Sequence, residues 1–457
     1  MILFDIHKII TYNIRCKSNS QIFFYSLIRL TSNKLDIDGG IMSGKLFSKN
    51  FSLLITGQAV SLFGNCILDF ALSMYVLEVT GSATIFAGFL ALAMLPTILL
   101  SPLGGVLADR ANRRNIMVVL DFIAGVVVLL AVIMIDRGNS LAIIGTTLVI
   151  QSILGAFENP TVQACVPQMQ TGDNIIRGNA VVNQISAVSA LAAPFIGSML
   201  YTSLGLKPVM YAGAACFFVT AIFECFIKLE DIQQKEKENI WRIIKKDITS
   251  SARFISHEKP CILKILSLVA VVAFFIQGLA LVGFPYIVRT VLGLNANYYG
   301  AAISILSFAS IVGSIIAGLL ATKFKIRKLN ITLFGIGFFL LPFGIIFMNV
   351  ANVYINYIAL IISFFLIQIA ACVFSIFALS IIQQLTPENM IGKVMAYTTT
   401  FSLCAQPLGQ IIYGMMFDKF SSMIYVVLIP TGLILCVIGF ISKRFFRNVE
   451  NKLNSTT

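Results

Sequence analysis

One short stretch, Gly105-Val-Leu-Ala-Asp-Arg-Ala-Asn-Arg-Arg114, decides the fold because it places one acid and three arginines between two long apolar runs. Residues 83–103 before it and residues 116–135 after it are predominantly apolar. Runs of about 20 apolar residues have the length that an α-helix needs to cross a bilayer. We therefore expect this stretch, which we call the charged loop, to be a tight turn between two membrane-spanning helices.

The composition of the whole chain indicates an integral membrane protein. Of the 457 residues, 58% are hydrophobic and 12% are charged, and the mean hydropathy is +0.91. Soluble chains have a larger charged fraction, of about 25%. Apolar stretches of spanning length recur along the chain, separated by short polar breaks. We therefore expect an all-α membrane protein with about twelve transmembrane helices.

The positive charge of the chain is best explained by its topology. A net charge of +13 would suggest a nucleic-acid partner in a soluble protein, but here Lys and Arg are concentrated in alternate loops. Basic loops lie on the cytoplasmic side of membrane proteins. We therefore predict that both termini are cytoplasmic and that the chain contacts membrane lipid and binds no nucleic acid. Abundant Ile, Asn and Lys are typical of an AT-rich bacterial genome, which places the chain in a bacterial inner membrane.

The residues that build most catalytic and metal sites are scarce in this chain. Its two histidines, His7 and His257, lie outside the apolar runs, and no two of its nine cysteines form a Cys-x-x-Cys pair. A His-based metal site or a Ser-His-Asp triad therefore has no place in the membrane core. We expect no enzyme activity, no metal and no cofactor.

The N-terminal extension, residues 1–41, differs from the rest of the chain. No stretch within it is long or apolar enough to be a membrane span or a signal peptide. It is either a flexible or interfacial arm or a segment that is not translated. A natural start at Met42 is favoured by the short basic lead of residues 43–50 directly before the first apolar run.

The rest of the chain divides into two similar halves around a polar linker. We expect a six-helix bundle at 42–227, a cytoplasmic linker at 228–261, a second six-helix bundle at 262–445 and a cytoplasmic tail at 446–457. Matching residues recur in the same order at a nearly constant offset: Gly81 with Gly293, Gly88 with Gly300, Gly105 with Gly318, and Pro194 with Pro407. Two six-helix repeats of the same orientation are typical of transporters.

The motif Gly-x-Leu-Ala-Asp-Arg-x-x-Arg-Arg between the second and third spans resembles the major facilitator superfamily, and the resemblance covers nearly the whole chain from Met42. Leu77-Glu-Val-Thr-Gly-Ser-Ala83 and Phe157-Glu-Asn-Pro-Thr-Val-Gln-Ala164 resemble the branch that contains macrolide-efflux and siderophore-export proteins. The resemblance implies alternating access by a monomer that exports a small amphipathic or hydrophobic molecule, driven by protons. A nutrient importer and a non-transporting receptor or assembly protein of the same fold remain the alternatives.

The charged loop then has an expected role as a cytoplasmic gate. Asp109 can face a helix N-terminus, and the three arginines can reach carboxylates on neighbouring helices. The residues of this predicted gate are Gly105, Asp109, Arg110, Arg113 and Arg114, with Asp121 and Glu158 as candidate partners. The alternative is that the arginines only set topology and bind lipid phosphate. The family's loop usually has Gly where this chain has Asn112, and Asn readily adopts glycine's left-handed backbone.

A polar stripe on the first span is the candidate coupling element. Gln58, Ser61, Asn65 and Asp69 fall at helical spacing on one face, which we expect to line the central cavity. A carboxyl at this depth is suited to take and release a proton, so we assign proton or substrate coupling to Asp69, Asn65 and Gln58. The alternative is a structural hydrogen bond to a neighbouring helix. Glu78, at the end of the span, is expected to be simply solvated.

Two further groups of residues are candidates for the substrate path and for helix motion. Polar residues at helical spacing on the fifth and eleventh spans include Asn183, Gln406 and Gln410, which either line the cavity or join neighbouring helices. Pro194 and Gly197, like Pro407 and Gly409, resemble an antiporter motif of the family. The alternative is ordinary helix bending and close packing.

Overall fold

The computed structural model describes residues 46–229, 260–320, 326–348, 352–387 and 391–454. The predicted N-terminal extension, most of the predicted linker, and Thr322, which replaces the loop aspartate in the second half, lie outside the described residues.

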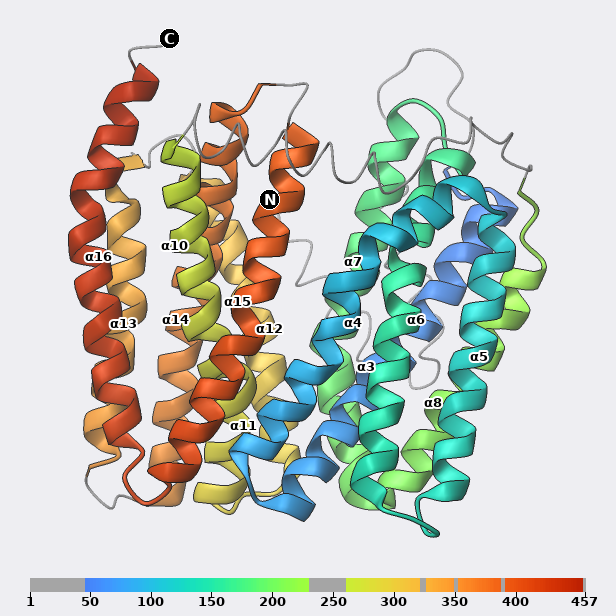
Figure 1. Cartoon of the computed structure of the whole chain (residues 1–457), viewed down its shortest axis with the longest axis horizontal. Helices are drawn as coiled ribbons and strands as arrows, with labels where there is room; N and C mark the ends of the chain where they lie inside the picture. Colours follow the sequence, from blue (N-terminus) through green and yellow to red (C-terminus); the bar gives the residue numbers. More distant parts are fainter. Residues whose placement is uncertain (1–45, 230–259, 321–325, 349–351, 388–390, 455–457) are drawn as a thin grey trace, which may run out of the picture. The chain divides into compact units, whose positions relative to one another are not determined.

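Helices account for all regular secondary structure of the described residues (Figure 1). The first half contains α3 (Lys49–Thr80), α4 (Ala83–Arg110), α5 (Arg113–Met134), α6 (Ser140–Met169), α7 (Asp173–Leu204) and α8 (Leu206–Cys225). The second half begins with one continuous helical segment made of α10 (Pro260–Gln277), η2 (Gly278–Gly283), α11 (Phe284–Tyr286) and η3 (Ile287–Val291). It continues with α12 (Ala296–Leu320), η4 (Ile326–Lys328), α13 (Leu329–Ile346), α14 (Val353–Leu385), α15 (Ile391–Lys419) and α16 (Tyr425–Asn454).

Eleven helices among the described residues are long and apolar enough to cross a membrane. The remaining long helix, α15, carries the polar stripe predicted on the eleventh span. The prediction of an all-α membrane protein with about twelve spans is confirmed. The last helix extends to Asn454, well into the segment predicted as a tail.

Polar side chains and glycines fix where the helices begin and end. Ser48 and Ser82 cap α3 and α4 by accepting a hydrogen bond from a backbone N–H of the first turn. Asn112 does the same for α5, accepting from the backbone N–H of Asn115 at 3.3 Å. Its φ is −66°, so Asn112 does not use the left-handed backbone that Asn can share with glycine. An extended residue whose side chain caps the next helix joins α4 to α5 instead.

The two halves repeat each other in detail. Gly81 ends α3 with φ 61°, and its predicted counterpart Gly293 follows η3 with φ 65°. These left-handed conformations favour glycine. Helix pairing repeats as well, because α4 packs on α6 as α12 packs on α14, and α5 packs on α8 as α13 packs on α16. Between the halves, α4 packs on α15 and α7 on α12.

The helices end at two faces. We call the end with the start of α3, the charged loop and the end of α16 the terminal face, which is uppermost in Figure 1. The other end, with the loops at Gly81 and Gly293, is the opposite face.

Candidate functional site

The charged loop is a very short connection, because α4 ends at Arg110 and α5 begins at Arg113. Asp109 and Arg113 therefore lie one on each side of the turn. Arg113 Nη2 is 3.6 Å from Asp109 Oδ1, and their side chains are 13% and 77% exposed. An ion pair with one exposed partner at this distance contributes little to stability. The acid of the loop is therefore free to change partners at little energetic cost.

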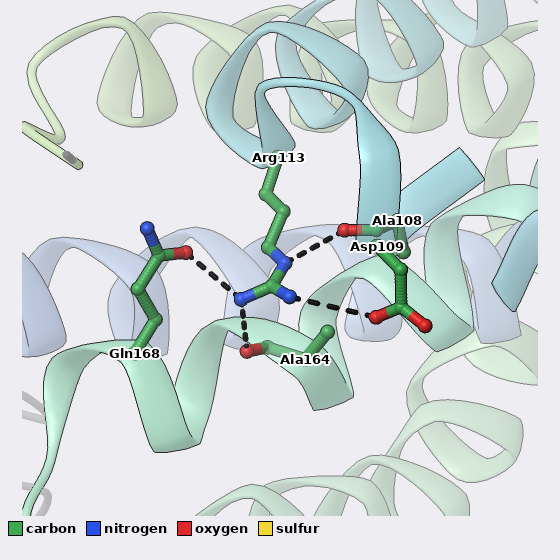
Figure 2. A network of polar contacts seen from close by, with 5 residues as sticks. All are labelled: Ala108, Asp109, Arg113, Ala164 and Gln168. Atoms are coloured by element: carbon green, nitrogen blue, oxygen red, sulfur yellow. Dashed lines mark hydrogen bonds and ion pairs between the residues drawn. The ribbon is translucent and has the colours of Figure 1, made fainter. Parts of the chain in front are cut away.

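Arg113 joins the ends of two helices (Figure 2). Its Nε donates to the carbonyl oxygen of Ala108 at 2.8 Å, which is one of the last carbonyls of α4. Its Nη1 donates to Ala164 O at 2.8 Å and to Gln168 Oε1 at 3.0 Å, both on α6. A planar guanidinium can make these bonds at the same time, which a lysine cannot do.

The neighbouring arginine makes a similar contact with a different helix. Arg114 donates from Nη2 to the carbonyl oxygen of Cys225, at the end of α8. Arg113 and Arg114 thus donate to backbone carbonyls and to Gln168. These are not the partners expected from the sequence, Asp121 and Glu158. For Ala108 and Cys225 the physical reason is that helix ends present carbonyls without an intrahelical donor, which attract cations.

Glycine has different roles at two adjacent positions of α4. A Cβ on Gly104 would overlap the carbonyl oxygen of Ala156 and lie 3.0 Å from Phe157 Cα, so α4 and α6 touch here backbone to backbone. A Cβ on Gly105 would meet nothing within 4 Å. Sequence reasoning selected Gly105 and missed Gly104, because adjacent glycines cannot be distinguished without the orientation of the helix.

The polar stripe of α3 passes from buried to exposed surroundings. Gln58 and Ser61 are buried, Asn65 is half-buried, and Asp69 is exposed although it lies well inside a membrane-spanning helix. Asp69 therefore faces open space rather than a packed neighbour. Its role in coupling stays a prediction.

Three acidic residues meet inside the first half, and we call them the carboxyl cluster: Asp121 on α5, Glu158 on α6 and Glu224 on α8. Asp121 and Glu224 are fully buried, Glu158 is half-buried, and their charges interact. Sequence reasoning missed Glu224. The signal that could have found it is an acid inside the apolar run of α8, where a charge is costly and usually functional.

At the opposite face, the two halves are joined by an ion pair that the sequence did not reveal. Glu78 of α3 lies 3.3 Å from Arg289 of η3 and accepts a hydrogen bond from the Tyr201 hydroxyl at 2.8 Å. The expectation that Glu78 is simply solvated was wrong. Arg289 also donates to Leu294 O at 2.8 Å, which fixes its guanidinium beside the loop.

A second contact at the opposite face is a helix cap supplied across the halves. Asp418 of α15 accepts from Ser82 Oγ at 2.6 Å, from the Ala83 N–H at 2.7 Å and from the Thr84 N–H at 2.9 Å. These N–H groups belong to the first turn of α4, where the helix dipole favours a negative charge. A carboxylate of the second half thus holds the start of a helix of the first half.

The contact between α7 and α12 depends on a proline. Pro194 has no N–H, so the carbonyl oxygen of Ala190 loses its intrahelical partner. Ser307 Oγ donates to this oxygen at 3.1 Å, and Ser304 Oγ donates to Leu191 O at 2.7 Å. A Cβ on Gly300 would lie 2.6 Å from Pro194 O, so the helices are close here. The proline thereby provides one acceptor, the carbonyl oxygen of Ala190, to the other half.

The remaining candidates on α7 and α15 differ in their surroundings. Asn183 is exposed and Gln406 is half-buried, whereas Gln410 is buried and its Nε2 lies 3.6 Å from Met94 Sδ of α4. In this conformation Gln410 therefore joins two helices. The glycines of the antiporter-like motif, Gly197 and Gly409, both lie at contacts between helices. A Cβ on Gly197 would lie 3.4 Å from Ile67 Cα, and a Cβ on Gly409 would overlap the carbonyl oxygen of Phe274.

Among the described residues, long membrane-spanning helices form two repeated halves that polar contacts join, which is the architecture of a membrane transporter. The model of the Major Facilitator Superfamily matches residues 54–409 and 266–455, and the chain belongs to this family. It is therefore a multi-pass membrane transporter of small molecules and not an enzyme.

Two macrolide efflux proteins among the relatives agree with the predicted branch. Macrolide efflux protein A of Streptococcus pyogenes is 25% identical over 398 residues, covering 85% of this chain and 94% of that protein. Macrolide efflux protein A of Enterococcus faecalis is 23% identical over 340 residues, covering 72% and 99%. The lysophospholipid transporter LplT of Cronobacter sakazakii is 27% identical over 177 residues, covering 38% and 43%.

Solved structures share the fold at low sequence identity. A bacterial homologue of the iron transporter ferroportin, in an inward-facing state, has a TM-score of 0.67 and 13% identity, covering 88% of this chain and 98% of that one. A mutant of the nucleoside transporter NupG has a TM-score of 0.67 and 11% identity, covering 85% and 99%.

Proposed function

We propose that this chain is a proton-coupled exporter of small amphipathic or hydrophobic compounds, such as macrolides, that works by alternating access. The observation that carries the proposal is the position of the polar contacts between the halves. Those recorded for the described residues run from the middle of the helices, at Ser304 and Ser307, to the opposite face, at Glu78 and Asp418. Contacts of this kind can break on one side while others form on the other.

The sidedness follows from the basic loops. Arg110, Arg113 and Arg114 lie at the terminal face, so the positive-inside rule assigns that face to the cytoplasm. Both termini are then cytoplasmic, the protein lies in a bacterial inner membrane, and this conformation is closed toward the outside. Export then requires the contacts of Glu78 and Asp418 to part.

The macrolide relatives support the substrate class, because the similarity to the Streptococcus pyogenes protein extends over both halves. In our proposal, Asp69 binds a proton in the path, with Asn65 and Gln58 on the same face of α3. Asn183 and Gln406 line that path. The chain acts as a monomer, because each of its two halves supplies one wall of the path.

The test is uptake of a radiolabelled macrolide into inverted membrane vesicles with an inward-acid proton gradient. We expect accumulation that an uncoupler abolishes and that Asp69→Asn reduces at least tenfold. The matched control is Asp136→Asn, which alters an exposed carboxyl paired with Lys207 in a loop of the opposite face. Transport that ignores both the uncoupler and Asp69→Asn would contradict the coupling. Accumulation only in right-side-out vesicles would indicate an importer, and no movement of any compound in a broad panel would indicate a receptor.

A further inference from the structure

The carboxyl cluster contains buried polar atoms that lack the hydrogen bonds such atoms normally make. Ser61 Oγ donates to Asp121 Oδ1 at 3.2 Å, but Asp121 Oδ2 and both carboxyl oxygens of Glu224 have no partner. The two carboxyl groups nevertheless lie within hydrogen-bonding reach of each other. An ionised carboxylate only accepts hydrogen bonds, so two carboxylates cannot bond without a proton between them.

An independent observation on another helix points into the same place. Gln58 of α3 is 4% exposed, and its side chain is near Glu158 and Glu224, yet its Nε2 has no hydrogen-bond partner. Glu224 itself packs on this part of α3, because its Cγ lies 3.8 Å from the position of a Cβ on Gly57. A buried amide donor thus lies within reach of carboxyl oxygens without a well-formed hydrogen bond to them, so the hydrogen bonds of the cluster are incomplete in this conformation.

The charges around the cluster do not compensate it. Within the described residues, the charged groups that interact electrostatically with Asp121 are Glu158 and Glu224. The groups that interact electrostatically with Glu224 are Glu158 and the Cys225 thiol. The charges of Arg113 and Glu224 both act on the Cys165 thiol, but the bonds of Arg113 go to Asp109, Gln168 and backbone carbonyls.

Burying several negative charges together without a cation is very unfavourable. A proton is the smallest occupant that removes one of these charges. Among the residues that the structure describes, no group of three or more His, Cys, Asp or Glu side chains is arranged to hold a metal ion.

We propose that Asp121 and Glu224 hold one proton between them and that Glu158 exchanges it with solvent, so that the carboxyl cluster is a proton-binding site. Glu158 suits the exchange because it alone of the three is partly exposed, next to the exposed Asn159. The proton comes from water and returns to water, so no other reactant is needed. This inference rests on the proposed function for its role in transport, while the binding of the proton can be tested separately.

The cluster is placed to affect the transport helix. Gln58 and Ser61, which touch the cluster, lie on the same stripe of α3 as Asp69. A change in the cluster's charge alters the strength of the hydrogen bond from Ser61 to Asp121. Because Ser61 and Asp69 both lie on α3, the change acts on the helix that carries Asp69.

The test is an infrared pH titration of the purified full chain in lipid, which needs no substrate. In the Asp69→Asn background, which removes the other carboxyl proposed to bind a proton, we expect the C=O stretching band of a protonated carboxyl at neutral pH, lost on adding Asp121→Asn or Glu224→Gln. The control Asp136→Asn should keep the band. Ser61→Ala retains all three carboxyls and should shift the band's frequency without removing it, which separates the assignment from misfolding.

Other outcomes overturn the inference. A band that persists in both Asp121→Asn and Glu224→Gln, or a band that Na⁺ or Ca²⁺ removes at constant pH, would show that the cluster does not hold a shared proton. If the band behaves as expected while macrolide transport ignores the proton gradient, the proton site stands and the proposed function fails. If transport is proton-driven but neither variant changes the band, the proposed function stands and this site fails.

Discussion

At the scale of single residues, the charged loop has a structural member and an adaptable member. Arg113 makes hydrogen bonds to two helices, whereas Asp109 is largely exposed and held by one long ion pair. The adaptable residue is the one expected to act in the gate, because a gating contact must be able to form and break.

Asp109→Asn tests this division. Since an exposed ion pair contributes less than about 1 kcal/mol, we expect the thermal stability of the purified chain to change little. We expect macrolide uptake into inverted vesicles to fall at least tenfold. Thr322→Asp, the corresponding change in the second half, should be tolerated in the same assay. Equal effects of the two changes would leave the arginines as topological signals only.

Arg113→Lys tests the structural member. Lysine cannot reproduce the fork that reaches Ala108, Ala164 and Gln168, so we expect a loss of about 1–3 kcal/mol of stability. Arg114→Lys is the control, because Arg114 has one recorded bond, to a backbone carbonyl. A thermal-shift measurement that finds the same melting temperature for both variants would contradict this role.

The adjacent glycines of α4 give a third residue-scale prediction. Gly104→Ala inserts a methyl group where Ala156 O already lies, and overpacking of this kind costs about 1–3 kcal/mol or more. Gly105→Ala meets open space and should be stable in this conformation. We expect reduced yield and a lower melting temperature for the first variant alone, measured by size exclusion after heating.

At the scale of elements, the contact between α7 and α12 combines a proline, which frees the carbonyl oxygen of Ala190, with two serines that donate to backbone carbonyls of the other half. Ser304→Ala removes the bond to the carbonyl oxygen of Leu191, worth about 0.5–1.5 kcal/mol. We expect the population of the conformation closed at the opposite face to fall roughly twofold to tenfold, seen in spin-label distances between the halves. Ser314→Ala, which loses a bond recorded within α12, should leave the distances unchanged.

The sequence was enough to predict the helices, but not how each helix is rotated about its own axis. Apolar runs and the repeated glycines predicted the helices and their duplication, since each depends on local composition. The rotation of each helix decided the rest: whether Gly104 or Gly105 packs, whether Asn112 caps, and whether Glu224 meets Asp121. Contacts across the halves, such as Glu78 with Arg289, join residues that are distant in the chain, and no local pattern encodes them.

At the scale of the whole molecule, charged contacts at Glu78 and Asp418 join the halves in the part of the chain that the structure describes. We expect Asp418→Asn to weaken the cap of α4, because an amide offers one acceptor oxygen where the carboxylate now serves three donors. The closed state should lose about 1–3 kcal/mol, measured as faster maleimide labelling of a cysteine introduced in the loop after α3. Asp136→Asn serves as the control, and equal labelling rates would contradict the prediction.

The same cap also determines how easily the protein can reverse its motion. Ser82 Oγ accepts from the Ile85 N–H within its own half while it donates to Asp418. When the halves part, α4 therefore keeps a cap of its own, and the released carboxylate and two N–H groups meet water. Exchange of such bonds for bonds to water is nearly balanced. Parting of the halves therefore leaves none of these groups without a hydrogen-bond partner, which makes this contact readily reversible.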